Sequence, residues 1–82
     1  MQLYLRQTRQ ALPAPRFARL MLQEDLLGGW ELIRETGQIG GKSRIQRELF
    51  THKAQALDAL EQARATFDKR GFTPSEPFSE AR

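Results

Sequence analysis

The chain has 82 residues, a formal net charge of +3 and no cysteine. That length suffices for one small domain, and the lack of cysteine excludes disulfides, thiolate metal sites and cysteine nucleophiles. The single histidine, His52, leaves no zinc-binding set, so we expect neither a metal nor a cofactor. No apolar run approaches the roughly 20 residues that cross a bilayer, and the first residues carry no signal-peptide core, which predicts a cytoplasmic protein with no membrane contact.

The first third of the chain predicts two strands. Residues 2–6 form a short strand, and Pro13 and Pro15 keep the following segment out of a helix. Residues 16–23 are apolar at both alternating sets of positions, which suits a strand that is covered to some degree on both faces. A helix also fits this segment, because Ala, Leu, Met and Arg are good helix formers.

A β-hairpin is predicted in the middle of the chain. Residues 30–35 and 42–50 are its strands, and the turn TGQIGG over residues 36–41 joins them. The glycines of this turn allow the positive φ that tight connections need. We expect the chain to reverse near Gly37.

The clearest element is a helix over residues 52–70. Its apolar residues recur at steps of three and four and form one stripe. Thr51 is a suitable N-cap, and Gly71 suits the left-handed residue that ends a helix. We expect a single domain over residues 1–72 and a flexible tail over residues 73–82.

Together these elements predict an α+β fold. A small antiparallel sheet of three to four strands is covered on one face by a single C-terminal α-helix. The core lies between that sheet face and the apolar stripe of the helix, where each large buried side chain contributes about 1.5–3 kcal/mol. The expected core residues are Leu20, Trp30, Leu32, Leu57, Leu60 and Phe67.

The segment GGKS at residues 40–43 looks like the end of a phosphate-binding P-loop. That motif needs a glycine, four residues and then Gly-Lys-Ser/Thr. Here the first position is Thr36, and the glycine comes one place late at Gly37. A P-loop also follows a buried apolar strand, whereas residues 30–35 are half charged. A hairpin tip is therefore favoured over a nucleotide-hydrolysing site.

No other catalytic set emerges from the sequence. His52 has Ser43 nearby in the chain but no acid placed to orient it. Asp58 and Glu61 lie one helical turn apart, an arrangement typical of solvent-facing carboxylates. We therefore expect a protein that is not an enzyme.

Basic residues gather on the predicted hairpin, where four cations between residues 34 and 47 stand against Glu35. Residues 1–23 likewise carry arginines and no acid. This distribution suits an anionic partner such as nucleic acid. Strand alternation points Arg44 and Arg47 to opposite sides, so one flat contact uses both only if the strand twists. The expected nucleic-acid-binding residues are Arg34, Gln38, Lys42, Arg44 and Arg47.

A set of spaced residues between Gly28 and Phe72 follows the pattern of a known family. In order and spacing they resemble the WGR domain, a small module found with poly(ADP-ribose) polymerases, in a molybdate-metabolism regulator and as free-standing bacterial proteins. The resemblance implies an antiparallel sheet with one covering helix and a role in nucleic-acid binding, with DNA favoured over RNA. The matching residues are Trp30, Leu32, Arg34, Gly37, Ile39, Gly40, Arg44, Phe50, Ala56, Lys69, Arg70, Gly71 and Phe72.

The triplet that names the family is altered in this chain. Where the family has Trp-Gly-Arg, the residues are Thr36, Gly37 and Gln38. Tryptophan offers a flat face for stacking on a base or sugar, and arginine offers a charged fork to phosphate. Threonine and glutamine supply neither, so the DNA-end contact that the resemblance implies for the polymerases is not expected here.

Two functions remain open from the sequence. The first is sequence-independent nucleic-acid binding through the basic hairpin. The second is a protein–protein interaction or homodimerisation through the sheet face that the helix leaves uncovered. Phe17, Met21 and Ile33 are the apolar residues expected on that face.

Overall fold

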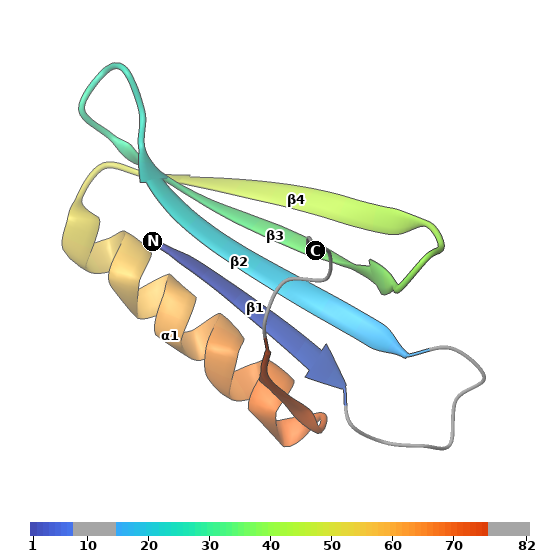
Figure 1. The fold of residues 1–82 in the computed structure, drawn as a ribbon. Coiled ribbons are helices and arrows are strands. Elements are labelled where there is room, and N and C mark those ends of the chain that lie inside the picture. The colour runs from blue at the N-terminus through green and yellow to red at the C-terminus, as the bar shows by residue number, and fades with distance from the viewer. Residues whose placement is uncertain (8–14, 76–82) are drawn as a thin grey trace.

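The computed structural model describes residues 1–7 and 15–75 (Figure 1). Its strands form one antiparallel sheet in the order β4-β3-β2-β1-β5. The expected α+β arrangement is confirmed, but the sheet has five strands instead of three to four. The elements are β1 (Gln2–Gln7), β2 (Arg16–Glu24), β3 (Trp30–Gln38), β4 (Ser43–Phe50), α1 (Lys53–Lys69) and β5 (Phe72–Pro74).

The additional strand, β5, extends from Phe72, the last residue of the expected domain, into Thr73 and Pro74 of the expected tail. Phe72 is 5% exposed, and its ring meets Phe67 edge to face with the ring centroids 5.1 Å apart. Covering this apolar side chain draws the chain after α1 back along β1. The backbone N–H of Ser75 then donates to the carbonyl of Tyr4 at 2.8 Å. The rest of the expected tail, residues 76–82, lies outside the described residues.

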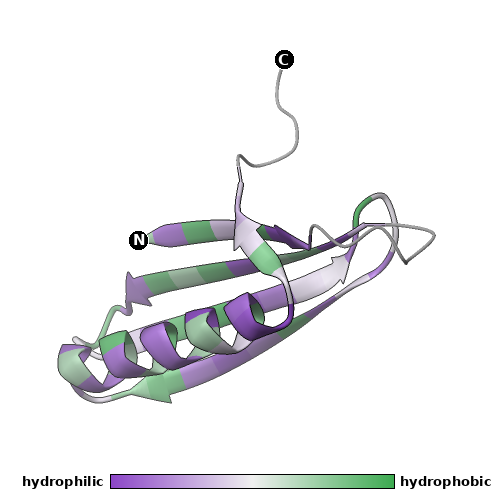
Figure 2. Cartoon of the chain, turned by 90° about the horizontal axis from the view of Figure 1, so that it is seen from below, coloured by the Kyte–Doolittle hydropathy of each residue, from purple (hydrophilic) through white to green (hydrophobic). Residues whose placement is uncertain are grey.

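The core lies between α1 and one face of the sheet, as Figure 2 shows from the helix side. Leu20 on β2 and Leu32 on β3 are both 0% exposed. Trp30 and Leu57, also expected in the core, are partly buried and pack against it. β2 alternates buried with half-buried residues, as a strand does, so the helical alternative for this segment is wrong. The buried helix residues are Ala56, Leu60, Ala63 and Phe67.

The β3–β4 hairpin turns later than expected, at residues 39–42. Gly40 has φ +82°, and Gly41 N–H donates to the carbonyl of Gln38 at 2.9 Å. Gly37 lies inside β3, where a Cβ would stand 2.3 Å from the carbonyl oxygen of Lys42. The reversal predicted near Gly37 is therefore misplaced, because this glycine provides space for the opposite strand. The GGKS segment lies in and just after a hairpin turn.

Both ends of α1 follow from local hydrogen bonds. The N-cap is His52 and not Thr51, and the backbone N–H of His52 donates to Oε1 of Gln55 at 3.4 Å. Gly71 has φ +90°, as expected for the residue after the helix.

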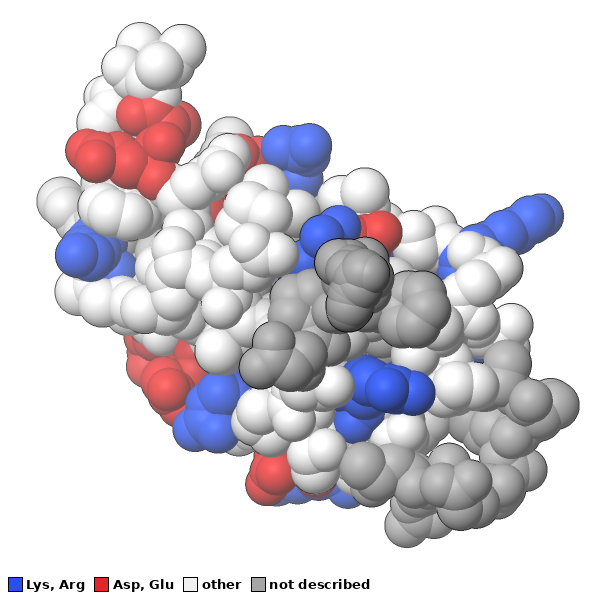
Figure 3. Space-filling model, viewed as in Figure 1, with Lys and Arg blue, Asp and Glu red and all other residues white. Residues whose placement is uncertain are grey.

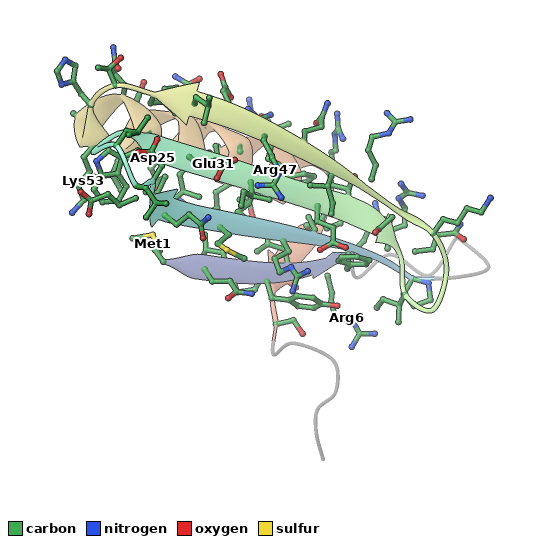
Figure 4. The ribbon with its side chains drawn as sticks, turned by 90° about the horizontal axis from the view of Figure 1, so that it is seen from above. Met1, Arg6, Asp25, Glu31, Arg47 and Lys53 are labelled. Atoms are coloured by element: carbon green, nitrogen blue, oxygen red, sulfur yellow. The ribbon has the colours of Figure 1, made fainter. Side chains whose placement is uncertain are left out.

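The sheet face opposite α1, here called the uncovered face, has no helix or strand over it in the part of the chain that the structure describes (Figure 4). Phe17, Met21 and Ile33 lie half-buried there, as expected. The rings of Tyr4 and Phe17 stack with centroids 5.8 Å apart. Ile45 on β4 is 55% exposed on the same face.

Cross-strand ion pairs neutralise charge on the uncovered face. Arg19 on β2 pairs with Glu35 on β3, and Ser43 Oγ donates to the same carboxylate at 2.9 Å. Burial raises the pKa of Glu35, but the hydrogen bonds from Arg19 and Ser43, together with the charge of Arg19, lower it below its usual value of 4.5. The folded state therefore favours the ionised form of this carboxylate.

Replacing Gly37 with alanine should destabilise the fold more than replacing Gly40. The Gly37→Ala Cβ is forced against backbone atoms, which we expect to lower the free energy of unfolding by about 2–3 kcal/mol. Gly40→Ala meets no atom within 4 Å and has only an unfavourable φ, so about 1 kcal/mol is expected. Urea unfolding of both variants measures the difference, and a Gly37→Ala protein as stable as the wild type would contradict the close strand approach.

Acid should remove the contribution of Glu35 to stability. Because the pKa of Glu35 is lower in the folded than in the unfolded protein, its contribution is present above pH 4.5 and is lost as the pH falls further. In Glu35→Gln, the free energy of unfolding should fall less between pH 5 and 3 than in the wild type. Ser43→Ala removes one of the hydrogen bonds to Glu35. Its fall in the free energy of unfolding over this pH range should lie between those of Glu35→Gln and the wild type. Equal pH dependence in all three proteins would contradict this assignment.

Candidate nucleic-acid interface

Helix α1 covers only part of the sheet face against which it packs. The part of that face formed by β4 is left open. Strand β4 contributes no residue to the buried core, and residues 43–49 of it are all exposed. Between α1 and β4 lies a groove of about 510 Å³. Its lining comes from all five strands, from α1 and from the residue that follows α1.

Arginines dominate the charge of this groove, which we call the arginine groove. Arg16, Arg34 and Arg44 come from β2, β3 and β4, and Arg70 follows α1. Among the lining residues the one carboxylate is Glu48, whose Oε1 lies 2.6 Å from Nη2 of Arg34. Within residues 1–7 and 15–75, no carboxylate pairs with the other three arginines. An excess of positive charge therefore lines the groove.

The floor of the arginine groove is partly apolar. Ala59, Ala63 and Phe67 of α1 line it, and the guanidinium of Arg70 lies 6.0 Å from the ring centroid of Phe67. Gln7 lines the same groove, and its Nε2 donates to the carbonyl of Arg70 at 3.1 Å. Its Oε1 is buried without a hydrogen-bond partner among the described residues. The groove thus combines cationic walls with a small apolar base.

A second hollow continues the groove toward the hairpin turn. It shares Arg16, Thr36 and Arg44 with the arginine groove and adds Gln38 and Lys42. Thr36, which occupies the tryptophan position of the Trp-Gly-Arg triplet, lies opposite Arg44 in the β3–β4 register and lines both hollows. Of the expected binding residues, the structure gathers Arg34, Gln38, Lys42 and Arg44 along the two joined hollows.

Arg47 is separated from the other expected residues. It lies on the uncovered face near Glu31, where Figure 4 labels both residues. Its Nη1 is 3.0 Å from Oε2 of Glu31. The strand alternation that separated Arg44 from Arg47 in the sequence thus holds in the sheet. One contact surface on the helix side does not include Arg47.

Two groove residues, Arg16 and Arg70, were not among the expected binding residues. Arg16 lies opposite Gln38 in the β2–β3 register, so correct pairing of the two strands would have found it. Arg70 gave no such signal, because its position depends on how α1 packs across the sheet. In the sequence Arg70 stands in the last turn of the predicted helix, where a basic residue is favoured by the helix dipole alone.

Other kinds of site find no support in the described residues. No three of their His, Asp or Glu side chains are grouped so that they could hold a metal ion. None of the helices in residues 1–7 and 15–75 is long and apolar enough to cross a membrane.

Comparison with known proteins identifies the domain. Searches of curated proteins and of solved structures return no match. A family model described as the WGR domain matches residues 1–79, which include every strand and the helix. The match extends the resemblance based on residues 28–72 to nearly the whole chain. WGR is a small binding-type domain, and this chain belongs to the WGR domain family.

Proposed function

We propose that this protein is a non-catalytic module that binds nucleic acid without sequence specificity and prefers DNA to RNA. The observation that carries the proposal is the arginine groove, in which Arg16, Arg44 and Arg70 have no carboxylate partner among the described residues. A phosphate backbone supplies the missing negative charge at regular intervals. The preference for DNA rests on the family resemblance.

Arginine suits this task because its planar guanidinium donates two parallel hydrogen bonds to one phosphate. Contacts to phosphates fix position without reading bases, which accounts for the absence of sequence specificity. Arg34 plays a different part, since Glu48 already holds its guanidinium at 2.6 Å. Lys42, beside the hairpin turn, extends the row of cations beyond the groove.

The altered triplet changes the expected mode of binding. Thr36 stands at the position of the family tryptophan and offers no ring for stacking. Arg16 and Arg44 line the same joined hollows as Thr36 and supply cations there. We therefore propose binding along the phosphate backbone of a duplex, with no stacking on a terminal nucleotide.

Replacing Arg44 should weaken DNA binding and its dependence on salt. If Arg16, Lys42, Arg44 and Arg70 each neutralise one phosphate, log affinity against log salt concentration should have a slope of about −3 to −4 for a duplex. Arg44→Ala should make that slope shallower by about 1, equally for duplexes of unrelated sequence. Fluorescence anisotropy with a labelled duplex at several salt concentrations measures both quantities.

Arg47→Ala is the matched control, because it removes the same charge from the same strand on the opposite face. It should leave the slope nearly unchanged. Equal losses of DNA affinity in Arg44→Ala and Arg47→Ala would contradict binding in the arginine groove. A wild-type protein that gives no salt-dependent signal at low ionic strength would contradict nucleic-acid binding altogether.

The uncovered face supports a second candidate function, the binding of a protein partner or of a second copy. Two of its arginines, Arg19 and Arg47, are paired with glutamates, which lowers the net charge that the face offers to a nucleic acid. Ile45 and Leu49 leave apolar surface exposed there, which suits a protein. A partner that requires Ile45 and not Arg44 would support this function over the first.

A further inference from the structure

Two leucines stand fully exposed at the tip of the loop that joins β2 and β3. Leu26 is 102% exposed and Leu27 is 96% exposed, more than any other large apolar residue that the structure describes. The loop projects beyond the end of the sheet, at the upper left of Figure 1. Adjacent exposed leucines on a projection form an apolar contact point that solvent alone does not explain.

The loop is held in one shape by its own hydrogen bonds. Asp25 Oδ1 accepts from the backbone N–H groups of Leu27 and Gly29, each at 2.8 Å. The backbone N–H of Asp25 donates to the carbonyl of Gly29 at 2.9 Å, and Gly28 has φ +90°. This turn keeps the leucines away from the chain that carries them. Within residues 1–7 and 15–75, no other segment of the chain covers them.

Acidic residues surround the base of this tip. Glu24 and Asp25 directly precede Leu26, and Figure 3 shows acidic atoms gathered where the loop leaves the body of the protein. Lys53, at the same end, is held over the ring of Trp30 with its Nζ 5.2 Å from the centroid. We call Glu24, Asp25, Leu26 and Leu27 the acidic leucine tip. Its charge disfavours phosphate-rich surfaces and favours an apolar hollow edged with cations.

The arginine groove of the same protein has that chemistry. Its base includes Ala59, Ala63 and Phe67, and Arg44 and Arg70 stand on its walls without carboxylate partners among the described residues. The tip does not reach Arg44 of its own chain. Arg44 lies opposite Thr36, six residues along β3 from Trp30, where the loop ends, and at about 3.3 Å per residue this places it about 20 Å from the loop.

We propose that the acidic leucine tip of one copy docks in the arginine groove of a second copy. The two surfaces are different, so the contact is heterologous: each docked copy still offers a free tip and a free groove, and assembly continues head to tail. The leucines cover the apolar base, and exposed Glu24 meets the arginines. Docking occupies the groove that we propose for DNA, so self-association and DNA binding compete. The docking itself does not require that DNA binds.

Two variants of the full chain test this docking. Leu26→Ser/Leu27→Ser removes the apolar tip, and Arg44→Glu reverses a charge in the groove. Sedimentation velocity at low salt should show wild-type mass rising with protein concentration and falling again when salt is added. Each variant alone should remain monomeric, with association weakened by more than about tenfold. Circular dichroism confirms that both variants are folded, as expected for changes at exposed positions.

Mixing the two variants gives the decisive result. The tip variant keeps an intact groove and the groove variant keeps an intact tip, so an equimolar mixture should form a dimer and grow no further. Leu49→Ser, on the uncovered face, is the matched control and should associate like the wild type. A wild type that stays monomeric, variants that still associate, or a mixture that stays monomeric would overturn the proposal. So would association that Leu49→Ser abolishes.

A DNA-binding readout separates this proposal from the proposed function. The tip variant should bind a labelled duplex at least as well as the wild type, whereas Arg44→Glu should bind it poorly. If neither the wild type nor the variants bind DNA, the result of the mixing experiment still tests the docking. Loss of DNA binding in the tip variant would contradict competition for one groove.

Discussion

The packing of one helix against a five-stranded sheet constrains every surface of this protein. Five strands spaced about 4.8 Å apart span roughly 19 Å, whereas a helix with its side chains is only about 10–12 Å wide. The apolar stripe of α1, which includes Leu60 and Phe67, packs against Leu20 and Leu32 of the sheet. It therefore covers the middle of one sheet face and leaves β4 exposed. The arginine groove is the space that this mismatch in width creates.

The strand periodicity then separates two kinds of basic residue. On the helix side, Arg44 faces a groove in which most arginines lack a carboxylate partner among the described residues. On the uncovered face, Arg47 is paired with Glu31, and Arg19 with Glu35. Two arginines of the uncovered face are thus neutralised, whereas three of the four arginines of the groove are not. This division is the basis for our proposal that phosphates bind on one side of the sheet and that a protein could bind on the other.

The same residues also protect the edges of the sheet. Strand β4 is a long edge strand with free backbone groups, and such edges invite pairing with other chains. Arg44, Arg47 and Glu48 place charge along it, which discourages β-augmentation. At the other edge, β5 is only three residues long and includes Pro74. Contacts with partners are accordingly expected through side chains in the groove and on the uncovered face.

Much of this fold was predictable because its signals are local. The apolar stripe of residues 52–70 and the alternation around Leu32 gave the helix, the hairpin and the core. Strand β5 was missed because three residues carry no periodicity, and their pairing depends on Phe72 finding cover against Phe67. The groove itself was not predicted, and only Arg34 and Arg44 of its four arginines were among the expected binding residues. Strand alternation grouped the hairpin residues, but the position of Arg70 depends on the docking of α1.

The most direct test of phosphate binding in the arginine groove is an NMR titration of labelled protein with a short DNA duplex. The Leu26→Ser/Leu27→Ser protein is the best sample, since it should remain monomeric. Chemical shifts should change at Arg16, Thr36, Arg44 and Arg70 and remain constant at residues of the uncovered face. Changes concentrated at Tyr4, Met21 and Ile33, with the groove unaffected, would contradict the assignment.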